Sequence, residues 1–415
     1  MSNTSLLKDK TFFRFWVGQI LSTFAFQMLS VGIGWQMYEL TDSALSLGLV
    51  GLAQFLPQLL LTLVVGHFAD QYNRLYIILA CRTLMALTVL ALAIGNLYNE
   101  MTPHLIYGCA AALGVSRAFE MPALQALVPN LVPSNRLASA MALMASAREA
   151  MVIVGPAIGG IIYILGPDVL YGSSTLCFIL SGLFLCRLQY NHIAKSKAPV
   201  TLSYLLGGLT YIRRNPVIMG SISLDMFAVL LGGATALLPI VAKDILETGP
   251  WGLGILRSAP AVGAVLMSIY LARRPLKCNV GKIMFRAVAI FGVATIIFGL
   301  STNLYISVFA LIMLGMADMI SVVIRSTLVQ LETPDEMRGR VSAANSVFIG
   351  SSNQLGEFES GATAALFGTV PAIVIGGIGT LAVVGIWTFL FPTLAKRDTM
   401  ETPVESGITV PVTGK

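Results

Sequence analysis

Long apolar runs separated by short polar clusters make up most of this chain. A helix needs about 20 mostly apolar residues to cross the hydrocarbon core of a bilayer, and cutting the runs at charged and turn residues leaves twelve stretches of suitable length. These predicted spans are 12–38, 45–68, 75–97, 105–127, 137–165, 169–188, 217–242, 253–271, 283–300, 304–328, 341–370 and 372–394. The pattern therefore predicts an all-α integral membrane protein with twelve transmembrane helices.

Composition supports the same class and narrows the possible chemistry. Hydrophobic residues make up 56% of the chain and charged residues 11%, and the mean hydropathy is +0.81, whereas a soluble globular chain is about a quarter charged. The five cysteines stand singly, and the sequence has no nucleophile motif, metal-ligand spacing or phosphate-binding glycine loop. We therefore expect a monomer embedded in lipid that is not an enzyme and holds no metal or cofactor.

The distribution of lysine and arginine orients the predicted spans. The formal net charge is +6, but the basic residues lie in short clusters between apolar runs rather than in one stripe, which argues against nucleic acid as a partner. These clusters fall on the side of the N-terminus, whereas the opposite loops are acidic, with Lys243 as the basic exception. Since cytoplasmic loops are enriched in lysine and arginine, we expect both termini in the cytoplasm.

The longest connection, between the sixth and seventh spans, indicates a domain boundary. Its stretch 191–200 is basic, and 202–214 has the pattern of an amphipathic helix at the membrane interface. We predict an N-terminal six-helix bundle over 1–190, a cytoplasmic linker with that helix over 191–215, a C-terminal six-helix bundle over 216–396 and a flexible tail over 397–415.

An internal repeat relates the two predicted bundles. The fourth span contains Leu113-Gly114-Val115-Ser116-Arg117, and the tenth contains Leu314-Gly315-Met316-Ala317-Asp318. The same offset aligns Pro133 with Pro334, just after each span. Because two similar bundles commonly surround one site near the bilayer midplane, the repeat predicts Arg117 and Asp318 at equivalent depths on opposite sides of a cavity.

Two short strings resemble motifs of the major facilitator superfamily. The stretch GHFADQYNR resembles the loop between its second and third spans, which closes the cytoplasmic side and has its signature positions at Gly66, Asp70 and Arg74. A second string, GPAIGG, resembles the antiporter motif, whose small residues let helices pack closely. Its members are Gly155, Pro156, Gly159 and Gly160.

Further strings around Arg117 and Arg338 resemble a narrower branch of bacterial drug and siderophore exporters. This resemblance implies the two-bundle fold of the superfamily, a place in the bacterial inner membrane, and export of a solute in exchange for protons.

Charged residues inside the predicted spans are candidates for coupling, since each costs at least roughly 2.5–3.5 kcal/mol at bilayer depth. Asp225 and Asp318 have no opposite charge one turn away in their own helices, so we expect them, and then Glu357, to carry protons. Arg117 and Glu120 lie three residues apart, are expected to pair, and are further coupling candidates. We also expect a buried charge network that comprises Arg148, Glu149, Arg257 and Glu359. For the charges of the fourth and fifth spans, a purely structural role is an equal alternative to a role in coupling.

Amide and aromatic residues in the spans are candidates for a substrate cavity. They are Gln27, Trp35, Gln36, Gln54, Phe227, Asn345 and Asn353. The combined hypothesis is proton-coupled export of a small amphipathic molecule, either drug-like or a siderophore, by alternating access. A lysolipid flippase, an importer of a solute or metal chelate, and a non-transporting membrane receptor or assembly partner remain alternatives.

Overall fold

A computed structural model of the chain describes residues 6–188, 202–276 and 278–400, except for side chains at 134, at 202–206 and at most positions from 62 to 71. Within these ranges it contains helices and no strand. Ten helical stretches are long and apolar enough to cross a membrane. Two more helices, α4 (Pro103–Leu131) and α13 (Asp335–Phe367), have 29 and 33 residues and are not among these ten. The prediction of an all-α membrane protein is confirmed.

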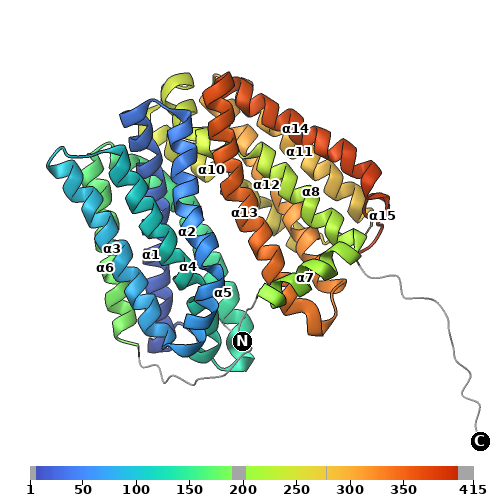
Figure 1. The fold of residues 1–415 in the computed structure, drawn as a ribbon, viewed down its shortest axis with the longest axis horizontal. Coiled ribbons are helices and arrows are strands. Elements are labelled where there is room, and N and C mark those ends of the chain that lie inside the picture. Colours follow the sequence, from blue (N-terminus) through green and yellow to red (C-terminus); the bar gives the residue numbers. More distant parts are fainter. Residues whose placement is uncertain (1–5, 189–201, 277, 401–415) are drawn as a thin grey trace, which may run out of the picture.

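The helices form two bundles, which Figure 1 shows side by side. The N-terminal bundle contains α4 and the helices α1 (Lys10–Thr41), α2 (Ala44–Gln71), α3 (Arg74–Leu97), α5 (Leu137–Tyr163) and α6 (Pro167–Cys186). The C-terminal bundle contains α13 and the helices α8 (Pro216–Gly232), α10 (Gly249–Arg273), α11 (Val280–Leu300), α12 (Leu304–Leu331), α14 (Thr369–Leu390) and α15 (Pro392–Ala395).

Side-chain caps fix where several of these helices begin. The Asp9 carboxylate accepts hydrogen bonds from the backbone N–H groups of Thr11 (2.8 Å) and Phe12 (3.2 Å), which otherwise have no partner in the first turn of α1. Asn215 caps α8 and Asn303 caps α12 in the same way. Polar residues between the apolar runs therefore also fix the residue at which a helix begins.

The predicted span 217–242 is interrupted in the structure. Helix α8 ends at Gly232, and the chain continues through η3 (Ala234–Leu237), α9 (Leu238–Ile240) and η4 (Val241–Ile245). At Gly233 the chain passes close to α13, because a Cβ added there would lie 3.1 Å from the carbonyl carbon of Gly356. This close contact and the proline at position 239 account for a break that hydrophobicity alone does not reveal.

The predicted linker helix is present as α7 (Leu202–Arg214), which packs against α13 and α8. The Ile212 side chain is fully buried, and the Tyr211 hydroxyl donates a hydrogen bond of 2.7 Å to the Glu332 carbonyl oxygen. The backbone of Gly208 lies directly against the Arg340 carbonyl. The segment is therefore fastened to the C-terminal bundle.

The predicted internal repeat has a structural counterpart in the packing of its two glycines. A Cβ added at Gly114 of α4 would lie 2.0 Å from the Gln54 carbonyl oxygen of α2, and one added at Gly315 of α12 would lie 1.9 Å from the Pro260 carbonyl oxygen of α10. Each bundle thus has the same close helix contact at corresponding positions, which requires a residue without a side chain.

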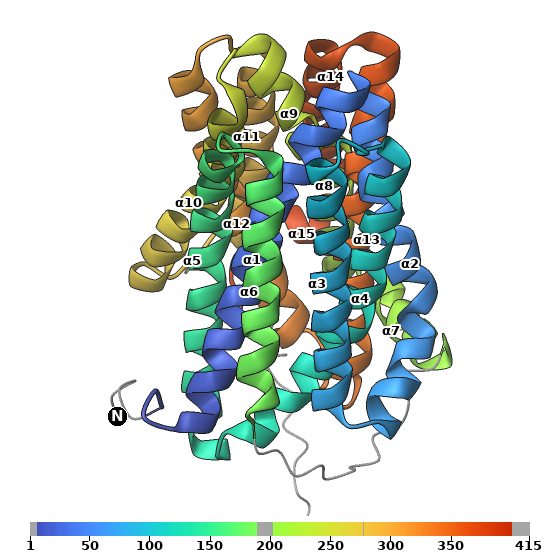
Figure 2. The ribbon, with the colours of Figure 1, turned by 90° about the vertical axis from the view of Figure 1, so that its left-hand side faces the viewer.

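The two bundles approach each other at one end of the molecule and separate toward α7 (Figure 1). The close cross-bundle contacts join α2 to α13 and α5 to α10. In α2 they involve Gly48, which lies against the Phe358 backbone, and in α5 they involve Gly160, which lies against Trp251. We call the end where the bundles meet the Lys243 end, because Lys243 of η4 lies there against Asp42 of the other bundle. Figure 2 shows α9, which directly precedes η4, at one end of the molecule and the N-terminus at the other.

Candidate functional site

A cavity of about 310 Å³ lies between the two bundles. Its walls come from α1, α2 and α4 on one side and from η3, α9, α10 and α13 on the other. The charged residues in its lining are Arg117, Arg257 and Glu357. The amide residues are Gln27, Gln54, Gln58, Asn353 and Gln354. The structure thus brings six of the predicted site residues together in one cavity: Gln27, Gln54, Arg117, Arg257, Asn353 and Glu357.

Arg117 projects from α4 over the face of Phe26 from α1. The central carbon of the guanidinium group lies 4.1 Å from the centre of the ring, which is a favourable geometry for a cation–π interaction. In the described part of the chain, the guanidinium has neither an ion pair nor a hydrogen bond with another residue. Arg117 was expected to pair with Glu120, and this prediction is wrong.

Glu120 instead binds Arg82 of α3, at 2.6 Å between the carboxylate and the guanidinium. Arg82 also donates a hydrogen bond to the Gln19 side chain of α1. The side chains of Arg82 and Glu120 are only 3% and 8% exposed. This pair and the Gln19 contact join three helices inside the N-terminal bundle, and the attraction between the opposite charges at 2.6 Å offsets the cost of removing both from water.

The C-terminal bundle has a corresponding polar cluster. Asp225 of α8 forms an ion pair of 3.0 Å with Arg325 of α12 and accepts a hydrogen bond of 3.0 Å from Ser321. Asp225 and Asp318 both line a pocket of about 10 Å³, which is large enough for about one water molecule. Asp225 was expected to be isolated, but it is paired with an arginine from another helix.

Asp318 differs from Asp225 in its surroundings. Among the residues that the structure describes, no ion-pair or hydrogen-bond partner contacts its carboxylate. It lies inside the C-terminal bundle in the small pocket, not in the lining of the central cavity. The prediction that Arg117 and Asp318 face one another across a cavity is therefore wrong, although both are one helix turn past the equivalent glycines.

Arg257 and Glu357 join the two bundles at the cavity. The Arg257 guanidinium of α10 donates a hydrogen bond of 3.2 Å to the Ser30 carbonyl oxygen of α1. The Glu357 carboxylate of α13 reaches α2 at Gly51, where an added Cβ would lie 2.7 Å from its Oε2 atom. Both charged groups therefore lie at contacts between the bundles that must break when the bundles move apart.

Several other predicted residues lie outside the cavity lining. Trp35 donates a hydrogen bond of 2.5 Å to Glu39, and Gln36 is hydrogen-bonded to Asn96 and to Tyr171 inside the N-terminal bundle. Phe227 packs against Trp387 with the two rings tilted by 55° and 5.2 Å between their centres. The Asn345 side-chain oxygen is buried on α13 without a partner. In this arrangement none of these four residues is among those that line the cavity.

The predicted buried charge network is not formed. Arg148 of α5 is exposed and Glu149 is half-buried, and α5 packs against α1 and α10 rather than beside α4. In the ranges described, neither residue takes part in an ion pair. Glu359 accepts a hydrogen bond of 2.8 Å from Thr363 in its own helix. Only Arg257 of the predicted network lies at the cavity.

The predicted gate loop is largely helical. Gly66 and Asp70 belong to the last turns of α2, but their side chains lie outside the described part of the structure. Arg74 begins α3, is buried, and has a guanidinium nitrogen 3.5 Å from the Ala126 carbonyl oxygen of α4. Arg74 thus holds the start of α3 against the C-terminal part of α4.

The glycines of the antiporter-like motif contact two different helices. Added Cβ atoms at Gly155 and Gly159 would lie 2.5 Å from the Gln27 side chain and 2.9 Å from the Met28 backbone, both in α1. At Gly160 an added Cβ would lie 2.4 Å from the Pro250 carbonyl oxygen of α10. Pro156 is buried in the helix between them. The motif therefore packs α5 both within its own bundle and across to the other one.

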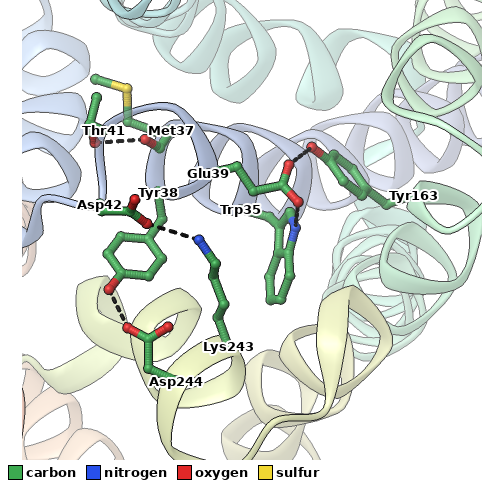
Figure 3. Close-up of polar contacts among 9 residues, drawn as sticks. All are labelled: Trp35, Met37, Tyr38, Glu39, Thr41, Asp42, Tyr163, Lys243 and Asp244. Carbon is green, nitrogen blue, oxygen red and sulfur yellow. Dashed lines mark hydrogen bonds and ion pairs between the residues drawn. The ribbon is translucent and has the colours of Figure 1, made fainter.

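Polar contacts join the bundles at the Lys243 end (Figure 3). The Lys243 ammonium group lies 2.9 Å from the Asp42 carboxylate and 4.9 Å from the centre of the Tyr38 ring. The Tyr38 hydroxyl donates a hydrogen bond to Asp244. Since Tyr38 and Asp42 belong to the first bundle and Lys243 and Asp244 to the second, these side chains hold this end together.

A family model described as transmembrane secretion effector matches residues 1–406. The enterobactin exporter EntS of Citrobacter koseri is 25% identical over 417 residues, which cover 98% of this chain and 97% of the exporter. The enterobactin exporter EntS of Escherichia coli O1:K1 / APEC is 25% identical over 400 residues, which cover 94% of this chain and 93% of the exporter.

Solved structures of transporters share the fold. A bacterial homologue of the iron transporter ferroportin, in an inward-facing state, matches with a TM-score of 0.71 at 14% identity, covering 96% of this chain and 100% of that one. A mutant of the nucleoside transporter NupG matches with a TM-score of 0.70 at 16% identity, covering 92% of this chain and 100% of that one.

Proposed function

We propose that this chain, which belongs to the transmembrane secretion effector family of the major facilitator superfamily, exports a small amphipathic solute in exchange for protons. Transport itself follows from membership of the family, and the chain is not an enzyme. The observation that carries the proposal is the cavity of about 310 Å³, which is lined by both bundles and contains charged groups from each. Cavities of this size suit small organic molecules.

The orientation proposed for the chain places α7 and both termini in the cytoplasm of a bacterium and the Lys243 end outside the inner membrane. Lysine and arginine are concentrated on the side of α7. In the arrangement described, the bundles contact each other at the Lys243 end and separate toward α7. We take this to be the state that receives a solute from the cytoplasm.

The proposed coupling uses carboxyl groups in the C-terminal bundle. Asp318 is the first candidate, because it lies in a small pocket beside Asp225 and has no ionic partner in the described part of the chain. Glu357 is the second, because it lies in the cavity wall where α13 contacts α2. Protonation would favour one arrangement of the bundles and solute binding the other, which is the basis of alternating access.

The proposed cargo is a siderophore of the kind that the relatives carry. Export of enterobactin is the activity named for both relatives described above. The test is expression of the chain in cells that make enterobactin but lack their own exporter, with enterobactin measured in the medium. We expect secretion to be restored and to stop when a protonophore collapses the proton gradient. Secretion that persists with the protonophore would contradict proton coupling.

A further inference from the structure

The charges around the central cavity do not balance. Arg82 and Glu120 neutralise each other inside the N-terminal bundle. Arg257 and Glu357, on α10 and α13, are near enough to interact electrostatically and carry opposite charges. Arg117 is near enough to Glu120 to interact electrostatically, but that carboxylate is already ion-paired with Arg82, and Arg148 adds a further positive charge nearby. The wall of α4 therefore keeps an excess of positive charge, and in the part of the chain described here no carboxylate lies at ion-pair distance from Arg117.

An unpaired guanidinium in a membrane protein calls for an anion. The group stays charged at any physiological pH, and burying a charge without a partner is unfavourable. Phe26 offers only the face of its ring, and its quadrupole cannot replace two charge-assisted hydrogen bonds. Arg117 lines the cavity without a hydrogen-bond acceptor in the described part of the chain, and a guanidinium group can bind a planar oxyanion through two N–H donors at once.

The opposite wall of the cavity offers acceptors instead of donors. The side-chain oxygen of Gln354 on α13 is buried and, among the residues that the structure describes, has no hydrogen-bond partner. Glu357 lies one turn further along the same helix and also lines the cavity. The walls between them are apolar, with Phe26, Phe55 and Leu113 in the lining. A molecule in this cavity therefore meets a cation on the side of α4 and acceptors on the side of α13.

We propose that Arg117 binds an anionic oxygen group of the cargo, and that the cargo is an amphipathic organic anion. This inference rests on the function proposed above and specifies its substrate class. A carboxylate or phenolate binds the Arg117 guanidinium, an aromatic part packs against the apolar lining at Phe55 and Leu113, and a hydroxyl or N–H group at the other end donates to Gln354 or Glu357. The binding step involves no covalent change.

A matched pair of fluorescent probes tests this assignment. Dansylglycine carries a carboxylate where dansylglycinamide carries a neutral amide, and the two are otherwise alike. Each is titrated into the purified full-length protein in detergent, without a pH gradient and with protein-free micelles subtracted. We expect the wild type to bind dansylglycine at least about tenfold more tightly than the amide, equivalent to about 1.4 kcal/mol. Equal binding of the two probes, or binding of neither, overturns the proposal.

Variants separate a direct contact from a structural role. Arg117→Gln should reduce the preference for the anion to about one and leave the affinity for the amide unchanged. Arg117→Lys keeps the charge and should retain part of the preference, which preserves the test if Arg117→Gln fails to fold. Arg273→Gln removes the same charge from the exposed end of α10 and should change nothing. Equal weakening of both probes by Arg117→Gln would contradict a direct contact.

The outcome is independent of the test of proton coupling. Anion preference in this assay requires neither a gradient nor net movement of the probe. A protein that shows the preference but does not secrete enterobactin would refute the proposed cargo and leave the anion site in place. A protein that secretes enterobactin without an anion preference would refute the role of Arg117 alone.

Discussion

Gly160 of α5 lies directly against Gly254 of α10, although the two helices belong to different bundles. A Cβ added at Gly160 would lie 3.2 Å from the Gly254 Cα atom, and a Cβ added at Gly254 would lie 2.5 Å from the Pro156 carbonyl oxygen. Neither neighbour can move aside, since both are backbone atoms. The antiporter-like motif thus has a physical role here, because it lets the bundles meet at the Lys243 end.

Replacing Gly160 with leucine should open this end. The leucine side chain cannot fit against the Pro250 backbone, so we expect the population to shift toward an arrangement in which the cavity is accessible from the Lys243 side. A cysteine introduced at Asn353 in the cavity wall, in a background without native cysteines, reports this access by its reaction with an impermeant maleimide added outside.

The matched control is Gly385→Leu, because an added Cβ at Gly385 meets nothing within 4 Å. We expect labelling of the cysteine to rise severalfold with Gly160→Leu and to stay at its original level with Gly385→Leu. Unchanged labelling with Gly160→Leu would mean that this glycine contact does not close the cavity.

The polar contacts at the Lys243 end should contribute modestly to closure. The Lys243 and Asp42 side chains are 33% and 74% exposed, and exposed ion pairs contribute about 0–1 kcal/mol. Lys243→Ala should therefore raise maleimide labelling in the same assay by less than about fivefold, within that range. Exchanging the charges in Asp42→Lys with Lys243→Asp should return labelling toward the wild-type level. A larger effect that the exchange does not reverse would point to a different role for Lys243.

Breaking the buried pair of Arg82 and Glu120 should destabilise the protein. Arg82→Met leaves the Glu120 carboxylate buried without its ionic partner, which typically costs about 3–5 kcal/mol. The double variant Arg82→Met with Glu120→Met should lose less, because no unpaired charge remains. Thermal unfolding of the purified variants in detergent measures both effects. A double variant that is less stable than Arg82→Met would show that the pair does not act as proposed.

The two aspartates of the C-terminal bundle should behave differently when replaced by amides. Asp225→Asn leaves the buried Arg325 without its ion pair and should lower both stability and yield. Asp318→Asn breaks no ion pair in the described structure, so the protein should fold normally and lose only its dependence on the proton gradient. Measuring thermal stability and gradient-driven transport for both variants separates these effects. Normal coupling in Asp318→Asn would eliminate it as the proton carrier.

The helices could largely be predicted from the sequence, because each apolar run must cross the bilayer as one helix with its backbone hydrogen bonds satisfied internally. The break after Gly232 was missed because the span was drawn from hydrophobicity, and the stretch around Gly233 is as apolar as the helix before it. The glycine pair at 232–233 and Pro239 are signals in the sequence, whereas the contact of Gly233 with Gly356 is visible only in the structure. The start of α13 at Asp335 was also missed, because cutting the runs at charged residues removed its exposed polar first turns from the predicted span 341–370.

The candidate site was predictable only in part. The cost of charge in a membrane correctly drew attention to Arg257 and Glu357, which line the cavity. Spacing within one helix gave the wrong partner for Glu120 and no partner for Asp225, because both bind an arginine from a neighbouring helix. The missed residues are Arg82 and Arg325. Both are charged residues inside predicted spans, so the energetic cost of a charge in the membrane could have identified them as well.

The most direct test of the account is simultaneous measurement of solute and proton movement in inverted vesicles that contain the purified protein. Enterobactin accumulation is followed by its absorbance after extraction, and the internal pH by an entrapped fluorescent indicator. With the lumen more acidic than the medium, we predict that enterobactin enters against its concentration gradient while protons leave. In Asp318→Asn we predict that the uphill accumulation and the coupled proton movement are both lost. Accumulation of enterobactin that is indifferent to the pH gradient would contradict the account.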